Sequence, residues 1–208
     1  MSSAPPLPPY PGGATDRATL RGALAIVLAV VTLDQVTKAL AVTHLVPRHT
    51  PFPVVGELLR FTLTYNPGAA FGMHLGPASR WIFLVLTLFI VGFLVRLFTG
   101  LPARERALKL AIASVIAGAI GNLIDRVRNV EGVVDFIDIG VGDVRFWTFN
   151  VADMAVSIGA VFLVLLLWRY ESRLHAAEHA AGHAGDHPSP GDPVAAHASE
   201  RAPEALER

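Results

Sequence analysis

Residues 81–98 read WIFLVLTLFIVGFLVRLF, and this stretch decides the fold. It contains no charged side chain before Arg96. A helix needs about 20 mostly apolar residues to cross the hydrocarbon core of a bilayer. The stretch meets that requirement, so the sequence predicts an integral membrane protein.

Three further apolar stretches lie on either side of this one. They cover residues 22–46, 108–124 and 149–168. The chain is 52% hydrophobic and only 16% charged, whereas soluble domains carry about 25% charged residues. We therefore expect an all-α membrane protein with four transmembrane helices. A large soluble helical bundle is the alternative, and the lengths of the apolar stretches disfavour it.

Charge and cysteine content exclude several classes of function. The formal net charge is zero, which argues against nucleic acid as a partner, because such proteins present a basic face. The chain has no cysteine, so disulfides, thiolate metal sites and a cysteine nucleophile are excluded.

The two ends differ in composition from the apolar middle. Residues 1–20 are rich in Pro, Gly and Ala and are predicted to form a flexible tail. Residues 171–208 are rich in His and Ala and are predicted to be disordered. Histidines recur there every four residues, at His175, His179, His183 and His187, and adventitious metal binding is the less favoured interpretation. The membrane domain is expected to cover residues 21–170.

Basic residues predict the orientation in the membrane. The short connection from Arg96 to Lys109 holds four of them, and such connections remain in the cytoplasm. Both termini are then cytoplasmic, and residues 47–80 and 126–148 lie outside. Residues 61–65, FTLTY, alternate with the period of a strand. We expect a small external β or loop segment between the first two spans, and a short external loop at residues 133–138.

Ionisable residues inside the spans are the first candidates for function. Each costs roughly 2.5–3.5 kcal/mol to insert, so it is retained for function or for tight pairing. Asp34 and Lys38 lie four residues apart on one helical face. They form either a pair that fixes helix packing or part of a site. A ladder of small residues, Ala113, Ala117 and Gly121, should let another helix approach the third span closely.

Four carboxylates are expected near one face of the membrane: Asp125, Asp135, Asp138 and Asp153. Two close carboxylates share a proton, so that one serves as general base and the other as general acid. The chain lacks an H-E-x-x-H motif, and Ser157 has no base nearby in the sequence. Spacing allows either Asp125 or Asp135 to pair with Asp153. Asn150 could cap the fourth helix.

Five short motifs together resemble the lipoprotein signal peptidases, also called signal peptidase II. The motifs are DQVTK at 34–38, YNPGAAFG at 65–72, GNLIDR at 121–126, VVDFID at 133–138 and FNVAD at 149–153. The resemblance covers residues 24–167. It implies a bacterial inner-membrane protein with four spans, cytoplasmic termini and a site near the outer face. Its members remove signal peptides from prolipoproteins, just before a cysteine that carries diacylglyceryl, and use two aspartates without a metal or other cofactor.

The resemblance also implies roles for individual residues. The catalytic pair falls on Asp135 and Asp153. A supporting polar shell falls on Asp34, Lys38, Asn66, Gly68, Asn122, Asp125, Arg126 and Asn150. Pro67 departs from the family, in which many members carry threonine.

The expected partners are diacylglyceryl-modified prolipoproteins and membrane lipid, and we expect a monomer. An ion- or proton-coupled transporter is the main alternative, because intramembrane carboxylates also form relays. A relay needs steps across the whole membrane, whereas these carboxylates gather on one side. A non-enzymatic assembly factor with a purely structural polar network is a third interpretation.

Overall fold

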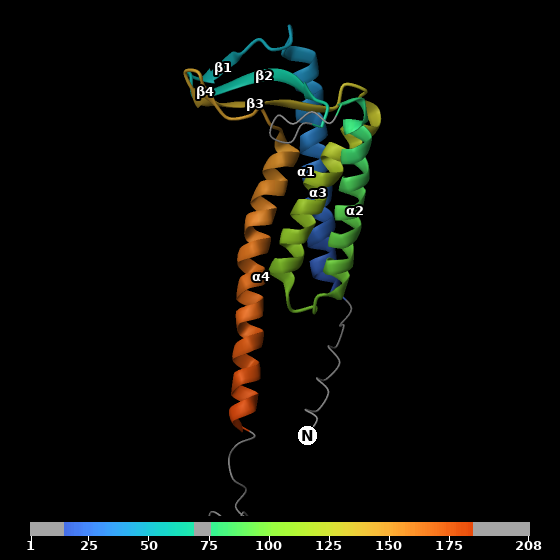
Figure 1. The fold of residues 1–208 in the computed structure, drawn as a ribbon, viewed down its shortest axis with the longest axis vertical. Helices are drawn as coiled ribbons and strands as arrows, with labels where there is room; N and C mark the ends of the chain where they lie inside the picture. The colour runs from blue at the N-terminus through green and yellow to red at the C-terminus, as the bar shows by residue number, and fades with distance from the viewer. Residues whose placement is uncertain (1–14, 69–75, 185–208) are drawn as a thin grey trace, which may run out of the picture. The chain divides into compact units, whose positions relative to one another are not determined.

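The computed structural model describes residues 15–68 and 76–184, and within them it places four long helices (Figure 1). The helices are α1 (Arg17–His44), α2 (Ser79–Gly100), α3 (Arg106–Arg128) and α4 (Val151–Ala184). Each is long and apolar enough to cross a membrane. The four predicted spans are thus confirmed as helices. A short 3₁₀ turn, η1 (Gly76–Ala78), precedes α2.

A small antiparallel sheet lies across one end of these helices (Figure 1). Its strands are β1 (Phe52–Val55), β2 (Leu59–Asn66), β3 (Val133–Val141) and β4 (Val144–Arg145), in that spatial order. The strand predicted at residues 61–65 is confirmed within β2. The sheet joins two distant parts of the chain, because β1 and β2 follow α1 whereas β3 and β4 follow α3.

Residues 133–138 are a strand rather than the loop that we expected. Thr64 lies opposite Asp135, and Asn66 lies opposite Val133. Residues 133–136 are all buried, so both faces of this strand are covered. A strand buried on both faces lacks the alternation of polar and apolar residues that identifies a half-exposed strand, so its sequence does not predict it.

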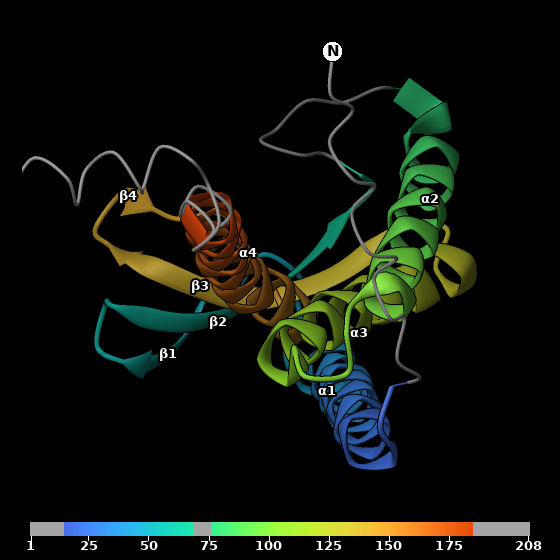
Figure 2. The same cartoon turned by 90° about the horizontal axis from the view of Figure 1, so that it is seen from below.

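Helix α3 is the centre of the helical packing, and Figure 2 shows it between α1 and α2. The predicted small-residue ladder on α3 is buried. A Cβ atom added at Gly118 would lie 2.2 Å from the carbonyl oxygen of Ala152. A Cβ atom at Gly121 would lie 2.7 Å from Asp34 Oδ2. Glycine at these two positions lets α1 and the start of α4 approach the backbone of α3 closely.

Both outer helix boundaries differ from the predicted ones. Helix α1 begins at Arg17, inside the tail expected at residues 1–20, because Asp16 accepts a hydrogen bond from the Thr19 N–H at 2.9 Å and caps the helix. Helix α4 continues to Ala184, so residues 171–184 are helical rather than irregular. The run after Tyr170 contains neither Gly nor Pro before Gly182, and nothing therefore stops the helix at residue 170. The remaining tail residues, 1–14 and 185–208, lie outside the described residues.

Contacts divide the chain into two compact units, residues 1–166 and residues 167–208. The first unit holds α1, α2, α3, the sheet and the first half of α4. The second unit contains the remainder of α4. Every residue of the candidate site lies in the first unit.

Candidate active site

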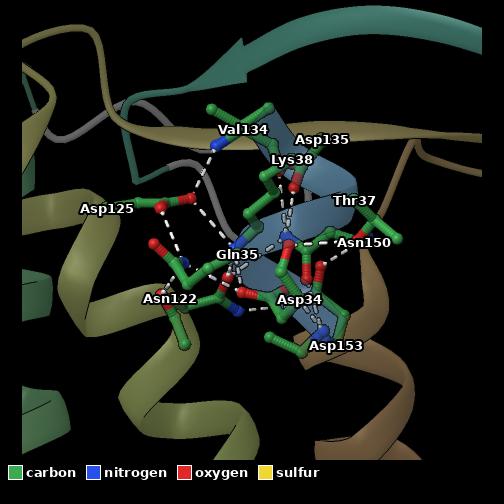
Figure 3. A network of polar contacts seen from close by, with 12 residues as sticks. Asp34, Gln35, Thr37, Lys38, Asn122, Asp125, Val134, Asp135, Asn150 and Asp153 are labelled. Carbon is green, nitrogen blue, oxygen red and sulfur yellow. Dashed lines mark hydrogen bonds and ion pairs between the residues drawn. The ribbon is translucent and has the colours of Figure 1, made fainter. Parts of the chain in front are cut away.

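A buried polar network lies where α1, α3, β3 and the start of α4 meet (Figure 3). It contains seven of the ten residues predicted for the site: Asp34, Lys38, Asn122, Asp125, Asp135, Asn150 and Asp153. Asp34 and Asn150 are 0% exposed, and Lys38 is 3% exposed. Buried charges need partners, and the network supplies one for each charge.

Lys38 joins two aspartates of different helices. Its ammonium nitrogen lies 2.9 Å from Asp34 Oδ2 and 2.9 Å from Asp125 Oδ2. The predicted Asp34–Lys38 pair is therefore confirmed, and Asp125 of α3 completes it. Sequence spacing could not reveal this third member, because the contact spans α1 and α3.

Asp125 holds the start of β3 against the helices. Its Oδ2 accepts the Val134 N–H at 3.1 Å, and its Oδ1 accepts from Gln35 Nε2 at 3.2 Å. Gln35 also donates to the carbonyl of Gly121. Sequence reasoning missed Gln35, although an amide directly after Asp34 in an apolar span was an available signal.

The first turn of α4 is capped from two directions. Asn150 Oδ1 accepts the Asp153 N–H at 2.9 Å, as predicted, and the Asn150 N–H donates to Asp153 Oδ2 at 3.2 Å. This reciprocal arrangement is a capping box. Asp34 Oδ1 accepts the Ala152 N–H at 2.9 Å. The position of Asp153 is thus fixed by its own helix and by α1.

Two asparagines connect Asp135 with Asp153. Asn150 Nδ2 donates to Asp135 Oδ1 at 2.7 Å, and Asn122 Nδ2 donates to Asp153 Oδ1 at 2.7 Å. Burial, and then the charge of Asp153, raise the pKa of Asp135 to about 7, against opposing hydrogen bonds from Asn150 and Asn66. A carboxyl with that pKa exchanges its proton near neutral pH, as general acid–base chemistry requires.

Asp135 and Asp153 line one cavity of about 560 Å³. Asn66, Gly68 and Arg126 also line it, and so do the aromatic residues Phe146, Trp147 and Phe149. Asp125 is not among its described lining residues. Residues 69–72 of the YNPGAAFG motif lie outside the described residues. Sequence reasoning missed Phe146 and Phe149 as wall residues, because nothing local distinguishes them from core aromatics.

The guanidinium of Arg126, which lines this cavity, uses only part of its hydrogen-bonding capacity within the described residues. Its Nη1 donates to the carbonyl of Asn122 at 3.3 Å, in its own helix, and its guanidinium lies 5.8 Å from the centre of the Phe83 ring. Among residues 15–68 and 76–184, no group forms a hydrogen bond with its buried Nε. Arg80, at the start of α2, donates to the carbonyls of Arg126 and Val127 and so fixes the end of α3.

Asp138 lies on the same strand but has a different environment. It accepts from Arg145 Nε at 2.6 Å, Arg60 Nε at 3.2 Å and Thr62 Oγ1 at 3.2 Å. Burial alone would raise the pKa of Asp138, but the hydrogen bond and charge of Arg145, with hydrogen bonds from Arg60 and Thr62, hold it below its ordinary value. Asp138 therefore ties β3 to its neighbouring strands and is separate from the cavity.

Potential metal ligands do not converge here: within residues 15–68 and 76–184, no three His, Cys, Asp or Glu side chains could jointly hold a metal ion. Four membrane-length helices and a buried carboxylate cluster at a cavity place the described part of the chain in a class, the membrane proteins with an embedded polar site. Comparison with known proteins narrows this class. The sequence profile of the family described as "Signal peptidase (SPase) II" matches residues 26–169. The chain belongs to this family, the lipoprotein signal peptidases, which are membrane proteases.

Individual relatives agree with this assignment. The lipoprotein signal peptidase of Hydrogenovibrio crunogenus is 40% identical over 159 residues, which cover 74% of this chain and 91% of that protein. That of Shouchella clausii is 41% identical over 154 residues, which cover 73% of this chain and 97% of that protein. A solved bacterial membrane enzyme superposes with a TM-score of 0.66 at 33% identity, covering 77% of this chain and 93% of the other.

Proposed function

We propose that this protein is an aspartic endopeptidase that removes signal peptides from diacylglyceryl-modified prolipoproteins, cutting before the lipidated cysteine. One observation carries the aspartic mechanism: Asp135 and Asp153 line the same cavity, and Asn150 is hydrogen-bonded to both. Membership of the lipoprotein signal peptidase family supports the assignment of prolipoproteins as the substrate. We expect the protein to act as a monomer.

The chemistry needs only water and the two carboxyl groups. The ionised carboxylate takes a proton from water, whose oxygen attacks the scissile carbonyl carbon, while the protonated carboxyl gives its proton to the carbonyl oxygen. The resulting tetrahedral intermediate collapses, the C–N bond breaks, and the leaving amine takes up a proton from the pair. One peptide bond and one water thus become a carboxylic acid and an amine.

The arrangement of charges favours a protease over a transporter. The carboxylates gather at the sheet end of the helices, whereas a relay would need steps along their whole length. The apolar stretch 81–98 carries no acidic residue at all. A lipid-bearing substrate could remain in the bilayer while its peptide enters the cavity beside the sheet.

The proposed function is tested by cleavage of a synthetic prolipoprotein peptide. The full-length protein in lipid vesicles should cut a diacylglyceryl-modified peptide, and mass spectrometry should locate the cut before the modified cysteine. The same peptide without lipid is the control and should remain intact. Failure to cut the modified peptide, or equal cutting of both, would contradict the proposal.

We expect Arg126→Lys to reduce cleavage by roughly 10-fold or more, since one hydrogen bond to a charged group contributes about 1.5–3 kcal/mol. Lysine cannot reproduce the planar guanidinium, whose Nε is buried beside the cavity and has no partner in the described part of the chain. Initial rates on the modified peptide measure the effect. Arg128→Lys, two residues further along the same helix end, is the control. Equal rates for both variants would mean that Arg126 only anchors the end of α3.

We also expect the α2–α3 connection to be cytoplasmic and the sheet to lie outside. Because the natural chain has no cysteine, a single cysteine reports its own location. Ala103→Cys should resist an impermeant thiol reagent applied to intact cells. Val130→Cys, at a position that is 83% exposed beyond α3, should be labelled readily. The reverse labelling pattern would invert the proposed orientation.

A further inference from the structure

The ammonium group of Lys38 restricts the orientation of a neighbouring amide. Besides its two aspartates, Lys38 Nζ donates to Asn122 Oδ1 at 2.9 Å. An ammonium group can only donate, so the oxygen of the Asn122 amide must face it. Asn150 Nδ2 donates to the same oxygen at 3.1 Å. Reversing the amide would place N–H groups against N–H groups on two sides.

The fixed orientation of the Asn122 amide determines which of its groups faces Asp153. With its oxygen facing Lys38, Asn122 presents Nδ2 to Asp153 Oδ1 at 2.7 Å. The other carboxylate oxygen, Oδ2, faces the backbone N–H of Asn150 at 3.2 Å. Both oxygens of Asp153 therefore face donors. A protonated carboxyl would need an acceptor for its O–H group, whereas an ionised one is well matched to these two donors.

We propose that Lys38 is a positioning residue: by fixing the Asn122 amide it keeps Asp153 ionised as the general base and leaves the shared proton on Asp135. The proposal rests on the proposed function, because it assigns the base and the acid of that reaction. The raised pKa of Asp135, caused by burial and then by the charge of Asp153, agrees with this division.

Other charged groups also act on Asp153 and must be held constant in a test. Asp135 faces it from β3, Arg126 from α3, and Lys38 and Asp34 from α1. Lys38→Met alone would leave Asp34 and Asp125 buried without their cation, and the protein could fail to fold. Combining Lys38→Met with Asp125→Asn leaves only one of these carboxylates, Asp34, which keeps its hydrogen bonds from the Ala152 N–H and from Gln35. The natural cluster has two carboxylates and one ammonium, the double variant has one carboxylate, and the net charge is one negative in both.

The test compares the pH dependence of kcat for the double variant and for the wild-type protein, whose clusters carry the same net charge. Asp125→Asn, which retains the bond from Lys38 to Asn122, is measured beside them to show the effect of residue 125 alone. Lys109→Met is the matched control. Lys109 is also a fully buried lysine, but it bonds Thr15 Oγ1 at the opposite end of α3. Full-length proteins in lipid vesicles are assayed on the diacylglyceryl-modified peptide, with KM measured at each pH.

The acid limb of the profile, which is the fall of kcat at low pH, should lie about one to two pH units higher in the double variant than in the wild-type protein, because a hydrogen bond to a charged group favours the ionised form by roughly 10- to 100-fold. The acid limb moves to higher pH because Asp153, without the fixed donor, holds its proton up to a higher pH. KM should stay within about threefold, since the groups that bind substrate are unchanged. Lys109→Met should keep the wild-type limb.

Coincident acid limbs for the double variant and the wild-type protein would overturn the proposal, and so would a rise in KM without a shift of the limb. Asn122→Asp is a second, independent variant. It retains a partner for Lys38 but replaces the donor to Asp153 by a carboxylate oxygen, so its limb should also move to higher pH. An unmoved limb in folded Asn122→Asp would contradict the proposal. Absence of cleavage by the wild-type protein would instead refute the proposed function.

Discussion

Asp135→Asn and Asp153→Asn should each lower cleavage of a diacylglyceryl-modified prolipoprotein by about 10²–10⁴-fold, the usual contribution of general acid–base catalysis. Asparagine keeps the size of the side chain and some of its hydrogen bonds, but it can neither take up nor release the shared proton. Single-turnover rates on the modified peptide measure the loss. The folded yield in detergent should remain near that of the wild-type protein.

The double variant should be hardly worse than either single one, because two parts of one catalytic unit do not contribute additively. Asp138→Asn is the matched control on the same strand. Asp138 bonds Arg145 and Arg60 outside the cavity, so its variant should lose some stability and retain activity. Asp125→Asn should be intermediate, because an amide oxygen can still accept the Val134 N–H. A dead Asp125→Asn beside an active Asp135→Asn would identify Asp125 as the partner of Asp153.

Features encoded by neighbours in the sequence could be predicted. The four apolar stretches predict the helices. The spacing of four residues predicts the Asp34–Lys38 pair, and the place of Asn150 three residues before Asp153 predicts the helix cap. Each of these depends on geometry within one helix. The helix ends were less accurate, because α4 lacks a stop signal before Gly182.

Features that depend on distant partners could not be predicted from the residues alone. Spacing left Asp125 and Asp135 equivalent as partners for Asp153. The distinction arises from a bond between Asp125 and the Val134 N–H, and from a cavity that includes Asp135. The strand β3 depends on pairing with β2, whose residues lie before α2. The contacts that Gln35 and Arg80 make with α3 depend on how α1 and α2 pack against that helix.

Close packing of α3 against α4 leads to the second large expected effect, at Gly118. A Cβ atom there would lie 2.2 Å from the carbonyl oxygen of Ala152 and 2.7 Å from Val156 Cγ2. The carbonyl oxygen belongs to the backbone at the start of α4 and cannot move without the helix. Gly118→Val should therefore push the first turn of α4 away from α3, and with it Asp153 from Asn122.

We expect Gly118→Val to lower cleavage by about 100-fold, since a displacement of about 1 Å in a catalytic group has an effect of that size. Overpacking should also lower the free energy of unfolding by about 1–3 kcal/mol. Thermal unfolding in detergent and cleavage per folded molecule measure the two effects separately. Gly92→Val is the matched control, because a Cβ at Gly92 of α2 would have no described atom within 4 Å. If Gly118→Val cleaves as fast as Gly92→Val, the contact between α3 and α4 does not set the position of Asp153, and the capping box at Asn150 must hold it alone.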